Sequence, residues 1–178
     1  AQALEDGATI FDVGGASSRP GAEAIAMEEE WQRVSMGLEA VRRVNAGVVV
    51  SVDTFRSEIV RRTVEKYGKI IVNDIMAGEG DEQMIATVAA LDLPYVAMHM
   101  RGTPQTMQSQ TEYSDVVAEV ADYLAAKAAE LEQNGVRREN IILDPGFGFA
   151  KSIEQNYALL AGLKRVVELG YPVLAGLS

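Results

Sequence analysis

Residues 48–53 read VVVSVD, an apolar run that stops at an acidic residue. A run rich in Val and Ile, without polar alternation, is typical of a strand buried on both faces. The same pattern recurs along the chain, and the residue after most runs is polar. The other runs cover residues 9–11, 70–72, 95–98, 141–143 and 173–176, and the first four are followed by Asp12, Asn73, His99 and Asp144.

Amphipathic stretches with helical spacing separate these runs, and an alternation of strands and helices predicts a parallel sheet. We expect an α/β fold of the (β/α)8 TIM-barrel type. Such a barrel needs about 250 residues, so residues 1–178 are expected to be part of one barrel domain, with about six βα units and without the first strand and the last part. The predicted helices cover residues 23–44, 113–133 and 154–169, with two more after residues 54 and 81.

Composition narrows the function. The chain is 48% hydrophobic and 24% charged, with a formal net charge of −10. This charge argues against a nucleic-acid or anionic-membrane surface. The absence of cysteine from the sequence excludes disulfides, thiolate metal sites and a cysteine nucleophile, and it fits a reducing compartment. No apolar run approaches the ~18 residues of a membrane helix.

The polar residues after the runs are the candidate site, because ligands of parallel α/β sheets bind at the carboxyl ends of the strands. A carboxylate there can accept two parallel hydrogen bonds from a fork of N–H donors, which an arginine or a 2-amino-pyrimidinone ring offers. Asn73 can donate to and accept from the same heterocycle, and Met98 and Phe149 can flank a flat ring. Each acid taken singly could instead be a helix or loop cap.

Three other features of the sequence bear on the kind of functional site. The loop DPGFGF at residues 144–149 does not have the G-x-G-x-x-G spacing of dinucleotide-binding loops. For His99, the only histidine, a structural and a catalytic role both stay open. No cluster with metal-ligand spacing is visible, although magnesium held mainly by a substrate pyrophosphate would leave little trace.

Taken together, the motifs resemble the dihydropteroate synthase family of pterin-binding enzymes. The resemblance covers the whole chain, with five motifs in order on consecutive βα units. These are DVGGASSRPG at 12–21, SVDT at 51–54, VNDI at 72–75, MH at 98–99 and DPGFGF at 144–149.

The resemblance implies an enzyme that joins 6-hydroxymethyl-7,8-dihydropterin pyrophosphate to p-aminobenzoate, with release of pyrophosphate, in folate biosynthesis. It implies two sets of binding residues. The expected pterin set is Asp53, Asn73, Ile75, Met98 and Asp144. The expected set for p-aminobenzoate and its mobile loop is Ser18, Arg19, Pro20, Gly148, Phe149 and Ser178.

The reaction implied is SN1-like: pyrophosphate leaves first, and the amine then captures the pterin methylene cation. Asp53, Ser18 and Arg19 are the expected catalytic residues, with Asp53 favouring the cation and Arg19 the leaving anion. Magnesium is the expected cofactor, with its protein ligand outside residues 1–178. The resemblance further implies a sulfonamide target, small-molecule partners only, a homodimer and a cytoplasmic location.

The chain departs from the family pattern at three positions. Ala16 stands where Glu is usual, Ser18 where Thr is usual, and Met100 where Asn is common. Two alternatives follow. One is a methyltetrahydrofolate-binding methyltransferase, which shares the pterin barrel but does not call for the SRPG loop at 18–21. The other is a non-catalytic pterin-binding relative, against which the intact Asp53, Asn73 and Asp144 argue.

Overall fold

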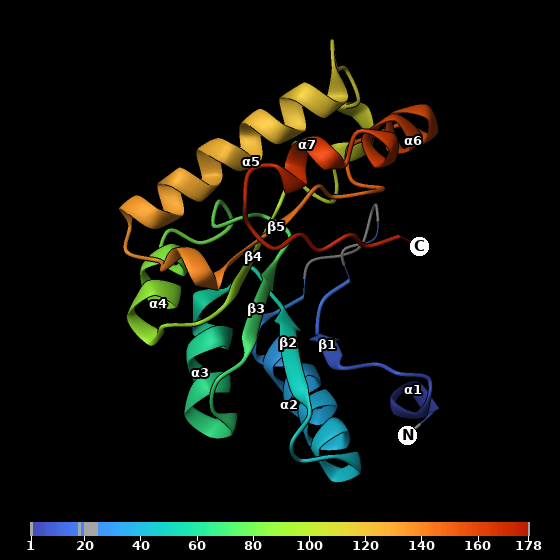
Figure 1. The fold of residues 1–178 in the computed structure, drawn as a ribbon. Helices are drawn as coiled ribbons and strands as arrows, with labels where there is room; N and C mark the ends of the chain where they lie inside the picture. Colours follow the sequence, from blue (N-terminus) through green and yellow to red (C-terminus); the bar gives the residue numbers. More distant parts are fainter. Residues whose placement is uncertain (1, 18, 20–24, 178) are drawn as a thin grey trace.

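The computed structural model describes residues 2–17, 19 and 25–177. It contains one five-stranded parallel sheet in which strand order follows chain order (Figure 1). The strands are β1 (Ile10–Gly14), β2 (Val49–Asp53), β3 (Ile71–Asp74), β4 (Tyr95–Met98) and β5 (Ile141–Asp144). Consecutive parallel strands joined by helices confirm the predicted α/β fold, with the arrangement of a (β/α)8 barrel.

Helices connect the strands and run along the outside of the sheet (Figure 1). The α-helices are α1 (Gln2–Glu5), α2 (Met27–Val44), α3 (Ser57–Tyr67), α4 (Met84–Leu91), α5 (Val116–Gln133), α6 (Ile153–Ala161) and α7 (Lys164–Val167). Two short 3-10 helices, η1 (Met107–Ser109) and η2 (Arg138–Asn140), complete the described elements.

The register places the ends of the strands level with one another. Asp53 of β2 lies opposite Gly14 of β1 and Asn73 of β3, and Asp144 of β5 lies opposite Met98 of β4. Because all five strands are parallel, the residues that end them lie along the same edge of the sheet.

The apolar run at 173–176 differs from the other five. It pairs with β5 through one parallel bridge between Leu143 and Val173, rather than as a regular strand. Two backbone hydrogen bonds hold it, from Leu143 N–H to the Pro172 carbonyl and from Leu174 N–H to the Leu143 carbonyl. Gly176 adds no side chain to pack against the sheet, which weakens a strand at this point.

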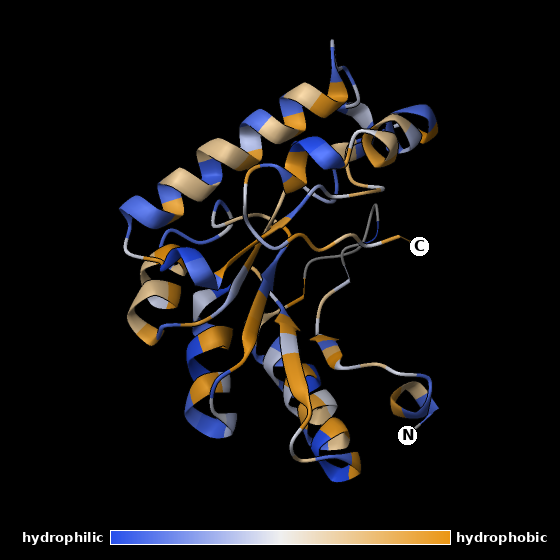
Figure 2. Cartoon of the chain, in the orientation of Figure 1, coloured by the Kyte–Doolittle hydropathy of each residue, from blue (hydrophilic) through white to orange (hydrophobic). Residues whose placement is uncertain are grey.

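The core lies between the strands and the helix faces turned toward them. Figure 2 shows apolar strands and helices that are apolar on one side and hydrophilic on the other. Val52, Val72 and Leu143 on the strands are fully buried, as are Leu38 of α2 and Leu124 of α5. This is the pattern expected when strands are covered by amphipathic helices.

The bounds of two helices differ from the prediction. One begins later because a side chain caps its first N–H groups, and the other is interrupted by a glycine. The helix predicted from 113 begins at Val116, because the Asp115 carboxylate accepts from the Val117 and Ala118 N–H groups and caps it. The helix predicted over 154–169 is two helices, and Gly162 ends the first. A Cβ atom on Gly162 would lie 2.6 Å from Val117, so this position is where the chain passes close to α5.

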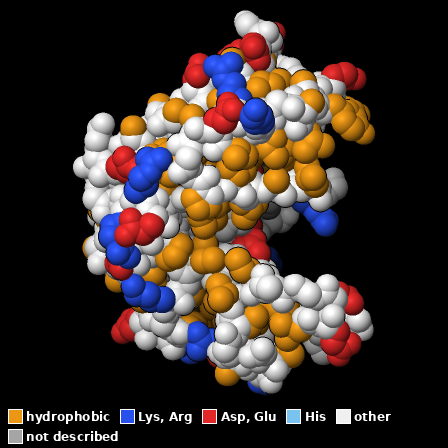
Figure 3. All heavy atoms as spheres, viewed as in Figure 1, with side chains coloured by type: hydrophobic (Ala, Val, Ile, Leu, Met, Phe, Trp, Pro, Cys, Tyr) orange, Lys and Arg blue, Asp and Glu red, His pale blue; other side chains and the backbone are white. Residues whose placement is uncertain are grey.

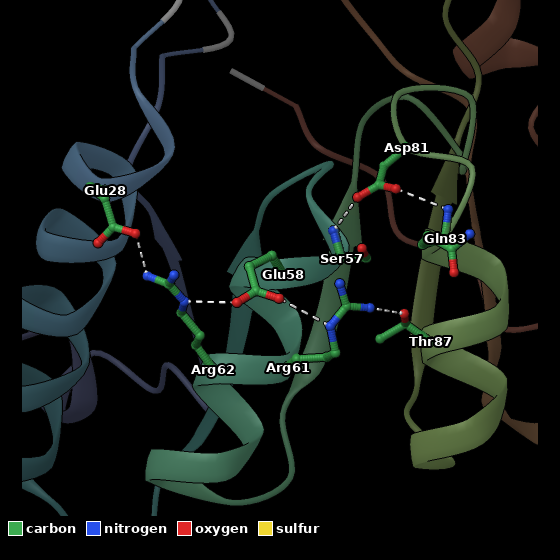
Figure 4. A network of polar contacts seen from close by, with 8 residues as sticks. All are labelled: Glu28, Ser57, Glu58, Arg61, Arg62, Asp81, Gln83 and Thr87. Carbon is green, nitrogen blue, oxygen red and sulfur yellow. Dashed lines mark hydrogen bonds and ion pairs between the residues drawn. The ribbon is translucent and has the colours of Figure 1, made fainter.

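The outer helices are also tied to one another by polar contacts (Figure 4). The Asp81 carboxylate accepts from Ser57 N–H at the start of α3 (2.7 Å) and from Gln83 N–H before α4 (2.9 Å). Arg62 of α3 bonds to Glu28 of α2 as well as to Glu58 of its own helix. Of the described helices, none has the length and apolar character needed to cross a bilayer.

Candidate functional site

Asp12, Asp53, Asn73 and Asp144 all line one cavity of about 480 Å³. Asp53 and Asp144 end their strands and Asn73 is next to the end of β3, whereas Asp12, predicted to follow its strand, lies in the middle of β1. The cavity runs along one face of the sheet, since Ile10 and Ile71 at the starts of β1 and β3 also line it. Figure 3 shows a hollowed face, with apolar side chains around the hollow and acidic atoms in its depth. The structure therefore brings together four side chains that are far apart in the sequence.

Asp12 is bound by its neighbours on both oxygens. Ser51 Oγ donates to Oδ1 at 2.5 Å, and Asn73 Nδ2 donates to Oδ2 at 3.2 Å. The bond to Asp12 fixes which end of the Asn73 amide faces it. The amide oxygen and the second N–H remain for a ligand, so Asn73 can serve a heterocycle as both acceptor and donor.

Asp53 lies half-buried among other acids. Desolvation by burial, together with the smaller effects of the charges of Asp12, Asp74 and Glu30, raises its pKa to about 7. A carboxyl group with this pKa is poised between its neutral and charged forms near pH 7. A ligand that brings positive charge would favour the ionised form.

Asp144 is buried and its backbone is anchored. Its Oδ1 accepts from Gly146 N–H at 2.7 Å, and its carbonyl oxygen accepts from His99 N–H at 2.9 Å. Burial raises the pKa of Asp144 to about 6, while the Gly146 N–H and the charge of Lys151 oppose this rise. At pH 7 the group is mostly ionised, and it retains acceptor capacity for N–H donors in the cavity.

The walls of this cavity are apolar. Ile75, Met98 and Phe149 line it together with the acids, and Ile75 and Met98 are almost fully buried. A flat ring inserted between these side chains would present its polar edge to Asp144 and Asn73. The structure thus places all five residues of the predicted pterin set around one space, with Phe149 beside them.

The residues predicted for p-aminobenzoate are not brought together in the same way. Ser18, Pro20 and Ser178 lie outside the described residues. Arg19 is exposed and does not line this cavity; its N–H donates to Ser17 Oγ at 3.3 Å. Gly148 is exposed and borders a neighbouring groove of about 460 Å³, which shares Gly176 with the cavity.

Two buried polar groups near the site were not identified from the sequence. Lys151 follows the DPGFGF loop and is 6% exposed. The sequence offered one signal for it, a lysine directly after an apolar, glycine-rich loop.

Glu30 is the second of these groups. It is fully buried and accepts from Thr54 Oγ1 (2.6 Å) and Arg56 Nη1 (2.7 Å). It borders a smaller cavity of about 210 Å³, which shares Asp53 with the first.

His99 belongs to the support of the site. Its Nδ1 lies 3.0 Å from Lys151 Nζ, and its ring contacts the Tyr123 ring edge-on with centroids 4.9 Å apart. Burial, together with the charges of Lys151 and Arg101, lowers the pKa of His99 to about 3, so the ring is neutral at ordinary pH. Lys151 then donates to Nδ1.

Among residues 2–17, 19 and 25–177, no group of three His, Cys, Asp or Glu side chains could hold a metal ion. The Asp12 oxygens are bonded to Ser51 and Asn73.

Comparisons with known proteins agree with this geometry. The sequence profile of the family described as pterin binding enzyme matches residues 1–178. The chain is 40% identical over 175 residues to the dihydropteroate synthase of Synechocystis, covering 98% of this chain and 60% of that protein. It is 44% identical over 175 residues to that of Escherichia coli, covering 98% and 61%.

Solved structures give the same result. The dihydropteroate synthase of Xanthomonas albilineans with 4-aminobenzoic acid has a TM-score of 0.90 at 42% identity, over 99% of this chain and 62% of that one. The same enzyme in complex with 7,8-dihydropteroate has a TM-score of 0.84 at 38% identity, over 99% and 61%. The chain thus spans about 60% of the length of these relatives. Because the family profile covers it from end to end, the chain belongs to the pterin-binding enzymes.

Proposed function

We propose that the protein containing this chain is a dihydropteroate synthase. It would join 6-hydroxymethyl-7,8-dihydropterin pyrophosphate to p-aminobenzoate, giving 7,8-dihydropteroate and pyrophosphate. The observation that carries this proposal is the single cavity where the Asp144 and Asn73 side chains meet the apolar walls of Ile75 and Met98. The similarity to dihydropteroate synthases solved with 4-aminobenzoic acid and with 7,8-dihydropteroate supports it.

Recognition of the pterin would rest on its amino-pyrimidinone edge. The amino group and the neighbouring ring N–H would donate to the Asp144 carboxylate, which is ionised at pH 7. Asn73, oriented by Asp12, would contact the other edge. Ile75 and Met98 would pack beside the ring.

Asp53 would act on the charge that develops in the reaction. The bond between the pterin methylene carbon and the pyrophosphate oxygen breaks, and pyrophosphate leaves with the electron pair. The amine nitrogen of p-aminobenzoate then forms a bond to that carbon and loses a proton. The ionised Asp53 would stabilise the positive charge of the pterin in the transition state.

The second substrate would bind beside the loop after β1. We propose that Ser18, Arg19 and Pro20 lie over p-aminobenzoate and the leaving pyrophosphate, with Arg19 contacting the anion. The Phe149 ring would contact p-aminobenzoate, near Gly148 and Ser178. The position of Phe149 in the cavity supports this part.

Magnesium would assist by neutralising charge on the leaving pyrophosphate. Since the described residues hold no metal cluster, we propose that its protein ligand lies outside residues 1–178. No step assigned above to the residues of this chain depends on it.

We also propose that residues 1–178 belong to a single barrel domain, and that the protein is a cytoplasmic homodimer. Its partners would be small molecules, with no nucleic acid and no membrane. The net charge of −10 supports the exclusion of nucleic acid and anionic membranes.

The test uses the full-length protein with radiolabelled p-aminobenzoate and the pterin pyrophosphate. Formation of labelled dihydropteroate with release of pyrophosphate is expected. Asp144→Asn should bind pterin at least about tenfold more weakly, because one charge-assisted hydrogen bond is lost and the new amide donor faces a donor on the ligand. Circular dichroism should show that this variant remains folded.

Pterin binding without turnover would instead indicate the non-catalytic relative. Transfer of a methyl group from methyltetrahydrofolate would indicate the methyltransferase. Unchanged pterin affinity in a folded Asp144→Asn protein would show that the carboxylate is a structural cap.

A further inference from the structure

Lys151 is a buried lysine between the 145–150 loop and α6, and the reaction described above gives it no role. Its side chain is 6% exposed. The Nζ atom lies 2.9 Å from the carbonyl oxygens of Gly146 and Phe149 and 3.0 Å from His99 Nδ1. An ammonium group has three N–H donors, and these three acceptors use all of them.

The loop that surrounds Lys151 has an unusual backbone. Gly146, Gly148 and Ala150 have φ values of +68°, +82° and +52°. For a residue with a side chain, such as Ala150, the left-handed region is unfavourable. The bonds from Lys151 to the Gly146 and Phe149 carbonyls hold the loop in this conformation.

The residues that Lys151 binds also hold Asp144. Gly146 donates its N–H to Asp144 Oδ1, and His99 donates its N–H to the Asp144 carbonyl. Gly146 therefore accepts from the ammonium group and donates to the carboxylate. The charge of Lys151 lowers the pKa of Asp144, against the effect of burial.

We propose that Lys151 is a positioning residue of the pterin pocket, which fixes Asp144 and Phe149 through the loop and holds a positive charge next to the backbone that bonds Asp144. This inference rests on the proposed function. Lys151 itself would not touch the substrate, because its three donors are already used by the protein.

The groups that face this cluster define the pH range for a test. The charged and titratable neighbours of Lys151 and His99 are Asp144 of β5, Arg101 after β4, Tyr113 before α5, and Glu119 and Tyr123 of α5. His99 is neutral, Glu119 has a lowered pKa, and Tyr113 and Tyr123 have raised ones. Asp144, with a pKa of about 6, and Lys151, with a pKa lowered to about 7 by burial, are the groups here that titrate near neutrality.

Two variants separate the effect of Lys151 on the loop conformation from the effect of its charge on Asp144. Lys151→Met keeps the apolar stem and removes every donor, so it should bind pterin at least about tenfold more weakly at pH 6.5. Lys151→Gln keeps two N–H donors but no charge. In this variant the pKa of Asp144 should rise, and the pH at which pterin affinity is half-lost should move up by about half a unit or more.

Lys127→Met is the matched control. Lys127 is also 6% exposed, but it lies on α5 and pairs with Glu79 and Glu130, outside the cavity. Its substitution should leave pterin affinity within about twofold, whatever it does to stability. Calorimetry with pterin on the full-length protein and each of the three variants, between pH 5.5 and 7.5, measures the affinities. Urea unfolding measures the stability of each variant.

The inference fails if Lys151→Met binds pterin as the parent does, or if Lys127→Met weakens binding as much. It also fails if the dependence of pterin affinity on pH is the same in Lys151→Gln as in the parent. This measurement can be made even if Lys151→Met does not fold. A parent protein that does not bind pterin would overturn the proposed function itself. These outcomes are distinguishable, because parent binding is measured first.

Discussion

Asn73 of β3 donates a hydrogen bond from Nδ2 to Oδ2 of Asp12 on β1, across the intervening strand β2. The bond joins strands that are not neighbours in the sheet, and both side chains line the cavity. Asp12 therefore does for Asn73 what Lys151 does for Asp144: it sets the orientation of a polar group that faces the ligand.

Removal of Asp12 should weaken ligand binding without unfolding the protein. In Asp12→Ala the Asn73 amide loses its fixed partner and can turn, so pterin affinity should fall by about fivefold, the equivalent of roughly 1 kcal/mol for one hydrogen bond. Calorimetry with pterin measures this. Ser51→Ala removes the other bond to Asp12 but leaves the one to Asn73; it should have the smaller effect, and equal effects would contradict the role given to Asp12.

The Asp53 carboxyl group should lower the free energy of unfolding at neutral pH in the absence of ligand. Its pKa is about 7 in the folded protein, against 3.8 for an ordinary aspartate side chain. Between these values the folded state keeps a proton that the unfolded state loses, so stability falls as the pH rises through this window. Asp53→Asn should therefore be more stable at pH 7.5, by about 1–3 kcal/mol after allowance for the partial exposure of the group.

Urea unfolding at pH 4 and 7.5 checks this sign. The stability of the parent relative to Asp53→Asn should fall between the two values. The absolute slope of each protein also depends on other groups: the raised pKa of Asp144 acts in the same direction, and the pKa of His99, lowered to about 3, acts in the opposite one. A variant less stable than the parent at pH 7.5 would show that Asp53 makes stabilising contacts when ionised.

The strands and their polar ends were predictable from the sequence for a physical reason. Runs such as residues 48–52 are apolar on both sides, and parallel strands all end at the same edge. The meeting of Asp53, Asn73 and Asp144 follows from those two facts, whereas Asp12 reaches the same cavity from the middle of β1. Their mutual bonds and pKa values do not, because these depend on the distances between side chains.

Other features depend on contacts that no local pattern reveals. Glu28, Glu29 and Glu30 are consecutive acids in the first turn of α2, yet only Glu30 of the three is fully buried. Its spacing of four and eight residues from the buried Val34 and Leu38 puts Glu30 on the inward face of α2, but no local pattern reveals that Thr54 and Arg56 are its partners there. The break at Gly162 is similar, since it arises from the close approach of Val117 on α5.

Glu30 should be important for stability, whereas Glu28 should not. Glu30→Gln weakens the bonds from Thr54 and from Arg56, whose side chain is 23% exposed. We expect a loss of about 2–4 kcal/mol in the free energy of unfolding, below the range for a fully buried ion pair. Glu28→Gln breaks an exposed pair with Arg62 (Figure 4) and should cost less than about 1 kcal/mol. Urea unfolding of both variants under one condition checks the contrast; similar costs would contradict it.

Gly146 should not tolerate a side chain. Its φ is +68°, and a Cβ atom there would lie 2.1 Å from the His99 carbonyl oxygen, so the backbone must shift. Gly146→Ala should therefore cost about 2–5 kcal/mol, the sum of left-handed strain and overpacking. The shift would also displace the N–H that binds Asp144 and the carbonyl that binds Lys151.

A substitution of Gly135, at the end of α5, separates the left-handed strain from the overpacking. Its φ is +90°, but the nearest atom to an added Cβ would be 3.8 Å away, an ordinary contact. Gly135→Ala should show left-handed strain alone, about 1–2 kcal/mol, and bind pterin like the parent. Urea unfolding and calorimetry on both variants give the comparison. If Gly146→Ala cost no more than Gly135→Ala and bound pterin equally well, the close packing of the loop against His99 would not be what holds Asp144 in place.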